Sequence, residues 1–404
     1  MRKTIFTVLI VFLASGIAFA GGYQVRLQGN KNTGMGLTGV GFSMGSSSIF
    51  YNPGALALMK QKSDFSAGAS FIMSNVIFEK TGTDYQAETD NKTSTPFYAY
   101  GAGKINDRWT VGLGVYTPYG SSSTWPDDWA GKLLIQNIAL QAIFFQPTVA
   151  FKVNDKIGIG AGFVYATGNV SIEKGLNYSP ESQVALEGSA SDIGFNLGVY
   201  YKPTDKLAFG IDYRSKVVME VTDGDAKFTL PSALYKTLPA ENKFDAQLPL
   251  PANLDFGLSY MATEKLMIAF ELNWVMWGTY DSLTFTFKEK GELLNSANPR
   301  KYEDSFIPRL GFSYKLNEQI CLRAGGYYDP TPTNEDYFTP ETVSLNTMAM
   351  TLGLSYMPMS NLSIDLSYLQ LFGMKSERSY LPENFSGTYK STAVIPGIGL
   401  SYRF

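Results

Sequence analysis

The sequence predicts an all-β, membrane-spanning fold, a closed antiparallel barrel of fourteen strands in a bacterial outer membrane. Three observations predict it: an N-terminus typical of exported proteins, segments of alternating hydrophobicity from residue 63 onward, and short turns that alternate with long loops. The 404 residues include Tyr 25, Phe 27 and Gly 39, and only 17% are charged, a composition that suits many strands and aromatic belts. Beyond residue 20 the sequence has no uninterrupted apolar run of about 18 residues, so helical spans are not expected.

The first twenty residues have the features of a cleaved secretory signal peptide. Arg2 and Lys3 precede an apolar stretch over residues 5–17, and the small-x-small pattern at residues 18–20 follows. Signal peptidase reads such a pattern, so we expect the mature chain to start at Gly21. An N-terminal membrane anchor is the alternative, but the stretch is short for a spanning helix.

Alternation of side-chain type is clearest in the last segment. Leu400, Tyr402 and Phe404 fall on one face, and Ser401 and Arg403 fall on the other. The first face suits lipid and the second suits a polar lumen. A soluble β-sandwich would give a similar local pattern, so alternation alone does not decide between the two folds.

The order of short and long connections distinguishes a barrel from a β-sandwich. The predicted strands are 63–75, 95–104, 109–119, 142–153, 156–172, 190–202, 205–219, 251–262, 264–278, 305–316, 318–328, 347–357, 360–371 and 392–404. Short turns alternate strictly with long loops along this series, which is typical of outer-membrane barrels with both termini on the periplasmic side. We therefore assign residues 63–404 to the barrel.

Residues 21–62 lack the period-two pattern. They are rich in Gly and Ser but also carry apolar side chains such as Leu37, Phe42 and Leu56, so they have enough apolar surface to pack against something. The interior of a fourteen-stranded barrel is wide enough to need filling. We expect this segment to form a plug, or hatch, inside the lumen.

Several motifs, in order, resemble the FadL family of outer-membrane transporters for long-chain fatty acids and other hydrophobic compounds. They are Gly34-Met35-Gly36, Asn52-Pro53-Gly54, Gly114 to Gly120, Trp129 to Lys132, and Pro308-Arg309-Leu310-Gly311. The family signature has Ala where Gly54 stands. The resemblance covers essentially the whole mature chain and implies a fourteen-stranded barrel with an N-terminal hatch.

The resemblance also implies a route for the ligand. Hatch gating is assigned to Asn52, Pro53 and Gly54. A kink in the third strand, opening the wall laterally toward the bilayer, is assigned to residues that weaken or end strand pairing, namely Gly112, Gly114, Pro118 and Gly120.

The long loop from Gly120 to Gln141 is unusually apolar for an extracellular loop. Its apolar residues have a helix-like spacing after Asp127 and Asp128. We expect an initial capture groove formed by Trp125, Trp129, Leu133, Leu134 and Ile138; loop packing over the barrel mouth is the alternative.

Enzymatic chemistry is not expected. The chain has no His, which excludes a Ser-His-Asp triad, a Cys-His pair and a His-ligated metal site, and we expect no catalytic residue, metal or cofactor. The carboxylates predicted to face the lumen are Asp212, Asp255, Glu271 and Asp365. We expect them to pair with lumen cations, Lys216 and Arg403 among them, and to hold plug and wall together.

Passive transport of a hydrophobic small molecule is the predicted function, since the sequence has no nucleotide-binding motif. Long-chain fatty acids are the first candidate substrate; aromatic hydrocarbons, a general porin or structural barrel, and a carboxylate-dependent hydrolase are the alternatives. If the ligand carries a carboxylate, Arg214, Arg309 and Arg323 are the candidate cations that bind it.

The expected surroundings follow from this fold. We predict contacts with outer-membrane lipid and lipopolysaccharide, and recognition by the barrel-assembly machinery through the C-terminal Tyr402-Arg403-Phe404. Nucleic acid is not an expected partner, because the chain has no basic excess. A closed barrel with its own plug can act as a monomer.

Overall fold

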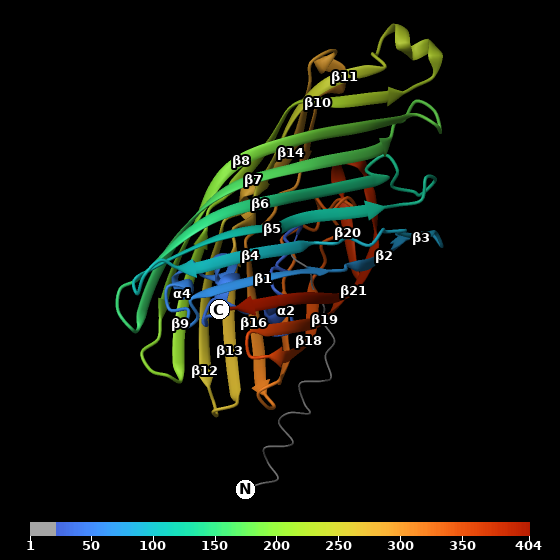
Figure 1. The fold of residues 1–404 in the computed structure, drawn as a ribbon. Helices are drawn as coiled ribbons and strands as arrows, with labels where there is room; N and C mark the ends of the chain where they lie inside the picture. Colours follow the sequence, from blue (N-terminus) through green and yellow to red (C-terminus); the bar gives the residue numbers. More distant parts are fainter. Residues whose placement is uncertain (1–21) are drawn as a thin grey trace.

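The computed structural model describes residues 22–404 and shows a closed β-barrel whose strands slope steeply around the axis (Figure 1). The predicted signal peptide, residues 1–20, lies outside the described residues. No helix in the described part is both long and apolar enough to span a membrane.

The wall is built from these strand segments: β1 (Ser63–Ser70), β2 (Met73–Lys80), β3 (Gln86–Glu88), β4 (Phe97–Lys104), β5 (Trp109–Thr124), β6 (Asn137–Lys152), β7 (Ile157–Gly175), β8 (Gln183–Tyr201), β9 (Leu207–Arg214), β10 (Val217–Thr229), β11 (Glu241–Leu250), β12 (Asn253–Met261), β13 (Leu266–Val275), β14 (Ser282–Phe287), β15 (Ser296–Pro299), β16 (Ser305–Lys315), β17 (Ile320–Asp329), β18 (Thr347–Met359), β19 (Leu362–Gly373), β20 (Ser376–Tyr380) and β21 (Phe385–Arg403). Some transmembrane strands consist of two such segments, for example β1 with β2 and β9 with β10, so the barrel has fourteen strands.

Antiparallel pairing runs all the way around the barrel. Phe65 of β1 lies opposite Tyr402 of the last strand and opposite Gly101 of β4. Closure removes the sheet edges, whose unpaired backbone groups would be costly in lipid. The predicted fourteen-stranded antiparallel barrel is confirmed.

The short turns at one end of the barrel share a local cause. In the turn between β4 and β5, the Asn106 side-chain oxygen accepts hydrogen bonds from the Arg108 and Trp109 amides, both at 2.9 Å. Asn154 and Asn317 cap their turns in the same way. A short acceptor side chain three residues before the start of the next strand therefore reverses the chain and satisfies the turn amides.

Side chains alternate between lipid and lumen as the sequence predicts. In β8, Ile193 and Leu197 are exposed outward, whereas Asn196 and Gly198 between and beside them are buried. Above this apolar belt the outward residues of the same strand become polar, with exposed Glu187 and Ser189. The upper part of β8 therefore extends beyond the hydrocarbon layer.

Several strands are longer than predicted, and some extracellular strand segments are missing from the prediction. The third strand extends to Thr124 and the fourth begins at Asn137, so the loop between them is shorter than expected. The segments β11, β14, β15 and β20 lie partly or wholly in regions assigned to loops. Outside the lipid a strand needs no apolar outer face, so its alternation is weak in the sequence.

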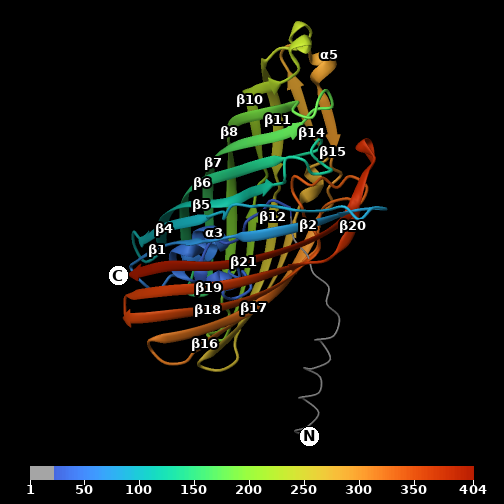
Figure 2. The ribbon, with the colours of Figure 1, turned by 90° about the vertical axis from the view of Figure 1, so that its right-hand side faces the viewer.

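The N-terminal segment, residues 22–62, lies inside the barrel (Figure 2). Its regular parts are short: α2 (Asn30–Thr33), a 3-10 turn η2 (Gly45–Ser47), α3 (Ser48–Tyr51) and α4 (Pro53–Leu56). Met35, Ile49 and Leu56 are fully buried. The segment packs on strands from opposite sides of the wall, α4 against β7 and β8, and α2 against β18 and β19.

Buried ion pairs join this segment to the wall. Arg26 contacts Asp255 at 3.0 Å and Glu271 at 2.5 Å, and Lys31 contacts Asp365 at 3.3 Å. Asp255, Glu271 and Asp365 thus link plug and wall as expected, but their cations come from the N-terminal segment and not from the wall residues expected as partners. Asp212 instead accepts a hydrogen bond from the Asn196 side chain of β8 at 2.6 Å. The alternating pattern predicts the facing of strand residues only, so it could not identify cations of residues 22–62 as partners.

Candidate functional site

An apolar groove lies on the extracellular side of the barrel, with a volume of about 200 Å³. We call it the outer groove. Its apolar residues come from several elements, among them Leu134 before β6, Phe228 of β10 and Phe287 of β14. Lys174 and Arg300 bring positive charge to the same groove.

Arg300 in this groove is held by a carboxylate. Its Nε and Nη2 donate to Glu341 Oε1 at 3.1 and 2.5 Å. Burial alone would lower the pKa of the Arg300 guanidinium, but the adjacent Glu341 more than offsets this, and the pKa lies above its ordinary value. The Arg300 guanidinium therefore keeps its charge.

The residues predicted to form the capture loop fall into three places. Trp125 and Trp129 are buried, with rings stacked at 4.1 Å, and pack against Phe78. Leu133 and Leu134 line the outer groove. The stretch after Asp127 forms turns and not the helix that the spacing suggested.

Ile138, the remaining predicted capture residue, lines a second cavity deeper in the barrel. This inner cavity is narrow, about 70 Å³, and its walls are mainly apolar side chains such as Leu186 of β8, Met219 of β10 and Leu248 of β11. Tyr23 of the N-terminal segment closes one side. The inner cavity therefore suits a hydrophobic group but is small in this conformation.

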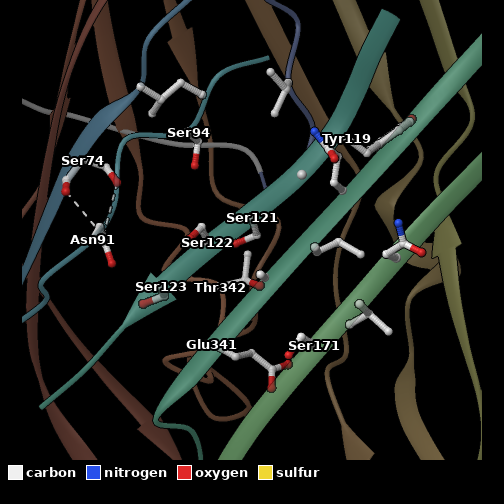
Figure 3. A pocket seen from close by; sticks show the side chains of 18 of the residues that line it. Ser74, Asn91, Ser94, Tyr119, Ser121, Ser122, Ser123, Ser171, Glu341 and Thr342 are labelled. Atoms are coloured by element: carbon white, nitrogen blue, oxygen red, sulfur yellow. Dashed lines mark hydrogen bonds between the residues drawn. The ribbon is translucent and has the colours of Figure 1, made fainter. Parts of the chain in front are cut away.

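A third and larger space, about 900 Å³, adjoins the inner cavity, and we call it the wall cavity. Figure 3 shows Glu341 and Thr342 beside it, with the serines of β5 at residues 121–123 and Ser94. Its lining includes buried lumen residues such as Thr347 and also outward-facing, exposed residues such as Glu187. The wall cavity is thus bordered by both faces of the barrel wall.

The third strand is irregular beside this cavity. Pairing of β5 with β4 ends at Tyr116, and its register with β6 shifts between Tyr116 and Tyr119. Beyond that point the edge of β5 bonds to the N-terminal segment: the Val25 amide donates to Pro118 O at 2.7 Å, and the Gly120 amide donates to Tyr23 O at 3.0 Å.

The residues assigned to the kink divide accordingly. Pro118 lies in the irregular stretch and Gly120 directly follows it. Gly112 and Gly114 lie in regularly paired β5, where an added Cβ would meet Ile49 of the N-terminal segment. These two glycines allow the N-terminal segment to approach the wall closely.

The residues assigned to hatch gating are fixed to the wall. Asn52 caps α4 by accepting from the Gly54 amide at 2.9 Å, and its Nδ2 donates to Val199 O of β8 at 3.0 Å. A Cβ on Gly54 would lie 2.7 Å from Gly198 O and 2.9 Å from Gly158 O. This close approach of backbones requires Gly on both sides.

The three candidate carboxylate-binding cations lie away from these spaces. Arg214 donates to Tyr116 Oη and Phe50 O, both at 2.7 Å. Arg309 stacks on Tyr327 at 4.6 Å, and Arg323 donates to Ser355 at 2.6 Å. Within residues 22–404, none of the three arginines borders the outer groove, the inner cavity or the wall cavity.

Comparison with known proteins identifies the family. Residues 11–404 match the family model described as "Outer membrane protein transport protein (OMPP1/FadL/TodX)". The chain belongs to this family. It is 24% identical to the long-chain fatty acid transport protein of Escherichia coli, over 93% of each chain. Members of the family are outer-membrane transport channels and not enzymes, and this FadL-family chain is an outer-membrane transporter of hydrophobic compounds.

Solved structures give the same fold. A Pseudomonas aeruginosa FadL homologue matches with a TM-score of 0.85 at 20% identity, covering 95% of this chain and 100% of its own. The toluene transporter TodX of Pseudomonas putida matches with a TM-score of 0.73 at 16% identity, covering 96% and 99%. These likenesses show the barrel fold in this FadL-family chain.

Two residues of the candidate site in this family member were not predicted from the sequence. Arg26 holds the N-terminal segment to two wall carboxylates, and Glu341 borders all three spaces. A cation in an apolar, Gly-rich segment was a usable signal for Arg26, because a buried charge needs a partner. Glu341 lies in a long loop without periodicity, so the sequence offers no comparable signal. Among the described residues no cluster of three or more potential metal ligands occurs.

Proposed function

We propose that hydrophobic small molecules enter through the outer groove, pass the inner cavity and leave through the wall cavity beside β5, driven only by their gradient. One observation carries this route: neighbouring spaces share lining residues. Ile172 and Leu186 line both the outer groove and the inner cavity, and Leu140 and Val170 line both the inner cavity and the wall cavity.

Capture begins at the outer groove. Leu133 is 40% exposed and, with Leu134, offers apolar surface to the outside. Trp125 and Trp129 shape the groove from below by supporting the loop, and the Trp125 indole N–H donates to Pro340 O at 3.2 Å. The tryptophans act as supports, and the leucines contact the ligand.

Gating is assigned to the N-terminal segment, which serves as the hatch. An inner cavity of about 70 Å³ is far smaller than the about 300–1,000 Å³ of ordinary ligand pockets, so this conformation is closed. Tyr23 borders the inner cavity and is bonded to β5. Movement of residues 22–25 would widen the path, while Asn52, Pro53 and Gly54 anchor the hatch below.

Release follows laterally at the irregular part of β5. Because the wall cavity is bordered by lumen residues and by outward-facing residues, a ligand there can leave without crossing the packed lower half of the lumen. The kink supplies this opening by ending the pairing of β5 with β4. Contacts with lipid and lipopolysaccharide, barrel-assembly recognition and a monomeric state stay predictions.

Two substrate classes suit this route. Long-chain fatty acids are the class expected from the sequence and named in the E. coli relative; aromatic hydrocarbons are the class named in TodX. The role of Arg214, Arg309 and Arg323 in carboxylate binding also stays a prediction. Unchanged fatty acid uptake after replacement of all three would contradict it.

The test is uptake of radiolabelled oleate and toluene by cells that lack their own transporter. The intact chain is expected to take up at least one of them. Ser122→Trp, which places a large ring in the wall cavity, should abolish this uptake, whereas Ser191→Trp on the outward face of β8, a residue that lines none of the three spaces, should not. Steady ion conductance without uptake would favour the porin alternative.

A further inference from the structure

Glu341 lies where the three spaces of the proposed route meet. It belongs to the loop between β17 and β18, and within residues 22–404 it is the one residue that lines the outer groove, the inner cavity and the wall cavity. Its side chain is 12% exposed and its partner Arg300 is 4% exposed. Any molecule that passes between the three spaces therefore passes this carboxylate.

The loop that carries Glu341 is fixed on several sides. Glu335 contacts Arg378 at 3.1 Å, and the Phe338 amide donates to Ser379 O at 3.0 Å. The Gly22 amide donates to the Ser344 hydroxyl at 3.0 Å. These contacts hold Glu341 where the spaces meet.

Positively charged side chains border the start of the proposed path but not its inner part. Lys174 and Arg300 border the outer groove, but among the described residues no Lys or Arg borders the inner cavity or the wall cavity. Glu341 is the one charged residue of the inner cavity within the described chain. A carboxylate ligand would leave water for an apolar space that holds another carboxylate and, among the described residues, no unpaired cation, whereas an uncharged ligand meets neither obstacle.

Arg300 weakens this repulsion, but its Nε, Nη1 and Nη2 already have partners, so it is not available to bind the carboxylate of a ligand. Its Nε and Nη2 are both directed to Glu341 Oε1, and its Nη1 lies near the carbonyl oxygens of Asn298 and Pro299. A ligand carboxylate would have to displace Glu341 from a buried ion pair. Breaking such a pair is strongly unfavourable because it leaves an uncompensated charge.

We propose that Glu341 is the specificity-determining residue of this channel and makes its inner path selective for uncharged hydrophobic compounds over carboxylates of equal length. The proposal rests on the transport route proposed above and names its substrate class. The outer groove, with Lys174 at hand, holds amphiphiles of either kind, and selection takes place at the step into the inner cavity.

The test compares uptake of radiolabelled dodecanol and dodecanoate at pH 8, far above the carboxyl pKa of about 4–5, in cells without their own transporter. The intact chain is expected to favour dodecanol about tenfold or more. Glu341→Gln should raise the ratio of dodecanoate to dodecanol uptake about tenfold, and the exposed control Glu303→Gln should leave that ratio as it is. Heat-modified mobility on gels reports the folded amount of each variant.

The double variant Arg300→Gln/Glu341→Gln leaves no unpaired buried charge and guards against a single variant that does not fold. It should keep the gain in dodecanoate uptake, because the repulsion is gone. If the gain in dodecanoate uptake disappears in the double variant, the unpaired Arg300 of the single variant attracts the acid. That result would contradict selection by Glu341. Equal uptake of both compounds by the intact chain, unchanged by Glu341→Gln, would contradict selection by Glu341 but would leave the proposed transport route standing. Uptake of neither compound would overturn both.

Discussion

The two halves of the lumen differ in how the N-terminal segment meets the wall. In the periplasmic half, glycines of the segment touch glycines of the wall, as Gly54 does with Gly158 and Gly198, and Arg26 is buried between Asp255 and Glu271. In the extracellular half the same chain meets the wall at residues 22–25, where backbone hydrogen bonds join it to β5 and the buried Tyr23 ring packs on Trp277 and Tyr280, and it is bordered by cavities.

This difference indicates that the two halves of the plug have different roles. Dense packing and buried ion pairs resist opening, so the lower half seals the barrel. The upper half borders cavities that leave room for movement, so we expect it to be the part that responds to a ligand. On the route proposed above, a ligand that leaves through the wall never requires the lower seal to open.

The largest expected effect comes from breaking the lower seal. Gly198→Val would place side-chain atoms where Asn52 and Pro53 lie, and backbone contacts there cannot yield. We expect the N-terminal segment to be displaced, turning a closed channel into one with steady conductance in planar bilayers. Gly103→Val is the matched control, because its Cβ would have 3.6 Å to the nearest atom, an ordinary contact. Equal conductance of the two variants would contradict the seal.

The buried ion pairs give the next effect. Arg26→Met leaves Asp255 and Glu271 buried without a cation and should lower the free energy of unfolding by about 3–5 kcal/mol. The triple variant Arg26→Met/Asp255→Asn/Glu271→Gln should recover most of this loss. Thermal unfolding followed by gel mobility measures both.

An exposed pair provides the comparison for that result. Lys202 contacts Asp205 at 2.8 Å with the aspartate fully in solvent, so Lys202→Met should leave the thermal stability close to that of the intact chain. A loss as large as that of Arg26→Met would show that stability does not depend on burial of the pair.

A smaller effect is expected in the upper half. Leu134→Ala removes about 1 kcal/mol of apolar contact with a ligand in the outer groove, which corresponds to an about fivefold higher half-saturating concentration. Uptake kinetics measure it. Leu316→Ala, an equally apolar change at an exposed periplasmic turn, should leave the kinetics as they are.

The smallest effect belongs to a turn far from both halves of the plug. Asn154→Ala removes the acceptor for the Lys156 and Ile157 amides and should cost about 1 kcal/mol of stability with uptake intact. Asn154→Asp retains an acceptor oxygen and should restore the stability. A loss of uptake in Asn154→Ala would mean that the periplasmic turns take part in transport.

Sequence reasoning succeeded where local chemistry and position in the bilayer agree. The lipid requires apolar side chains at every second position of each strand, and Asn and Thr residues mark the turns between strands. The number of strands and the face of each side chain could therefore be predicted directly. The capture loop shows the limit of this reasoning, because apolar side chains in a loop look alike in the sequence whether they face a ligand or, like Trp125 and Trp129, stack against each other. Their predicted role in capture stays a prediction.

The sequence by itself determined the barrel, its fourteen strands, its alternating faces and the absence of His chemistry, because each follows from local residue type against a fixed environment. Tertiary structure alone decided which cations neutralise the lumen carboxylates, why glycines of β7 and β8 are needed, and which residue stands where the three spaces meet. Those depend on contacts between residues hundreds of positions apart, such as Arg26 with Glu271, and no local pattern encodes which distant partner closure of the barrel will bring.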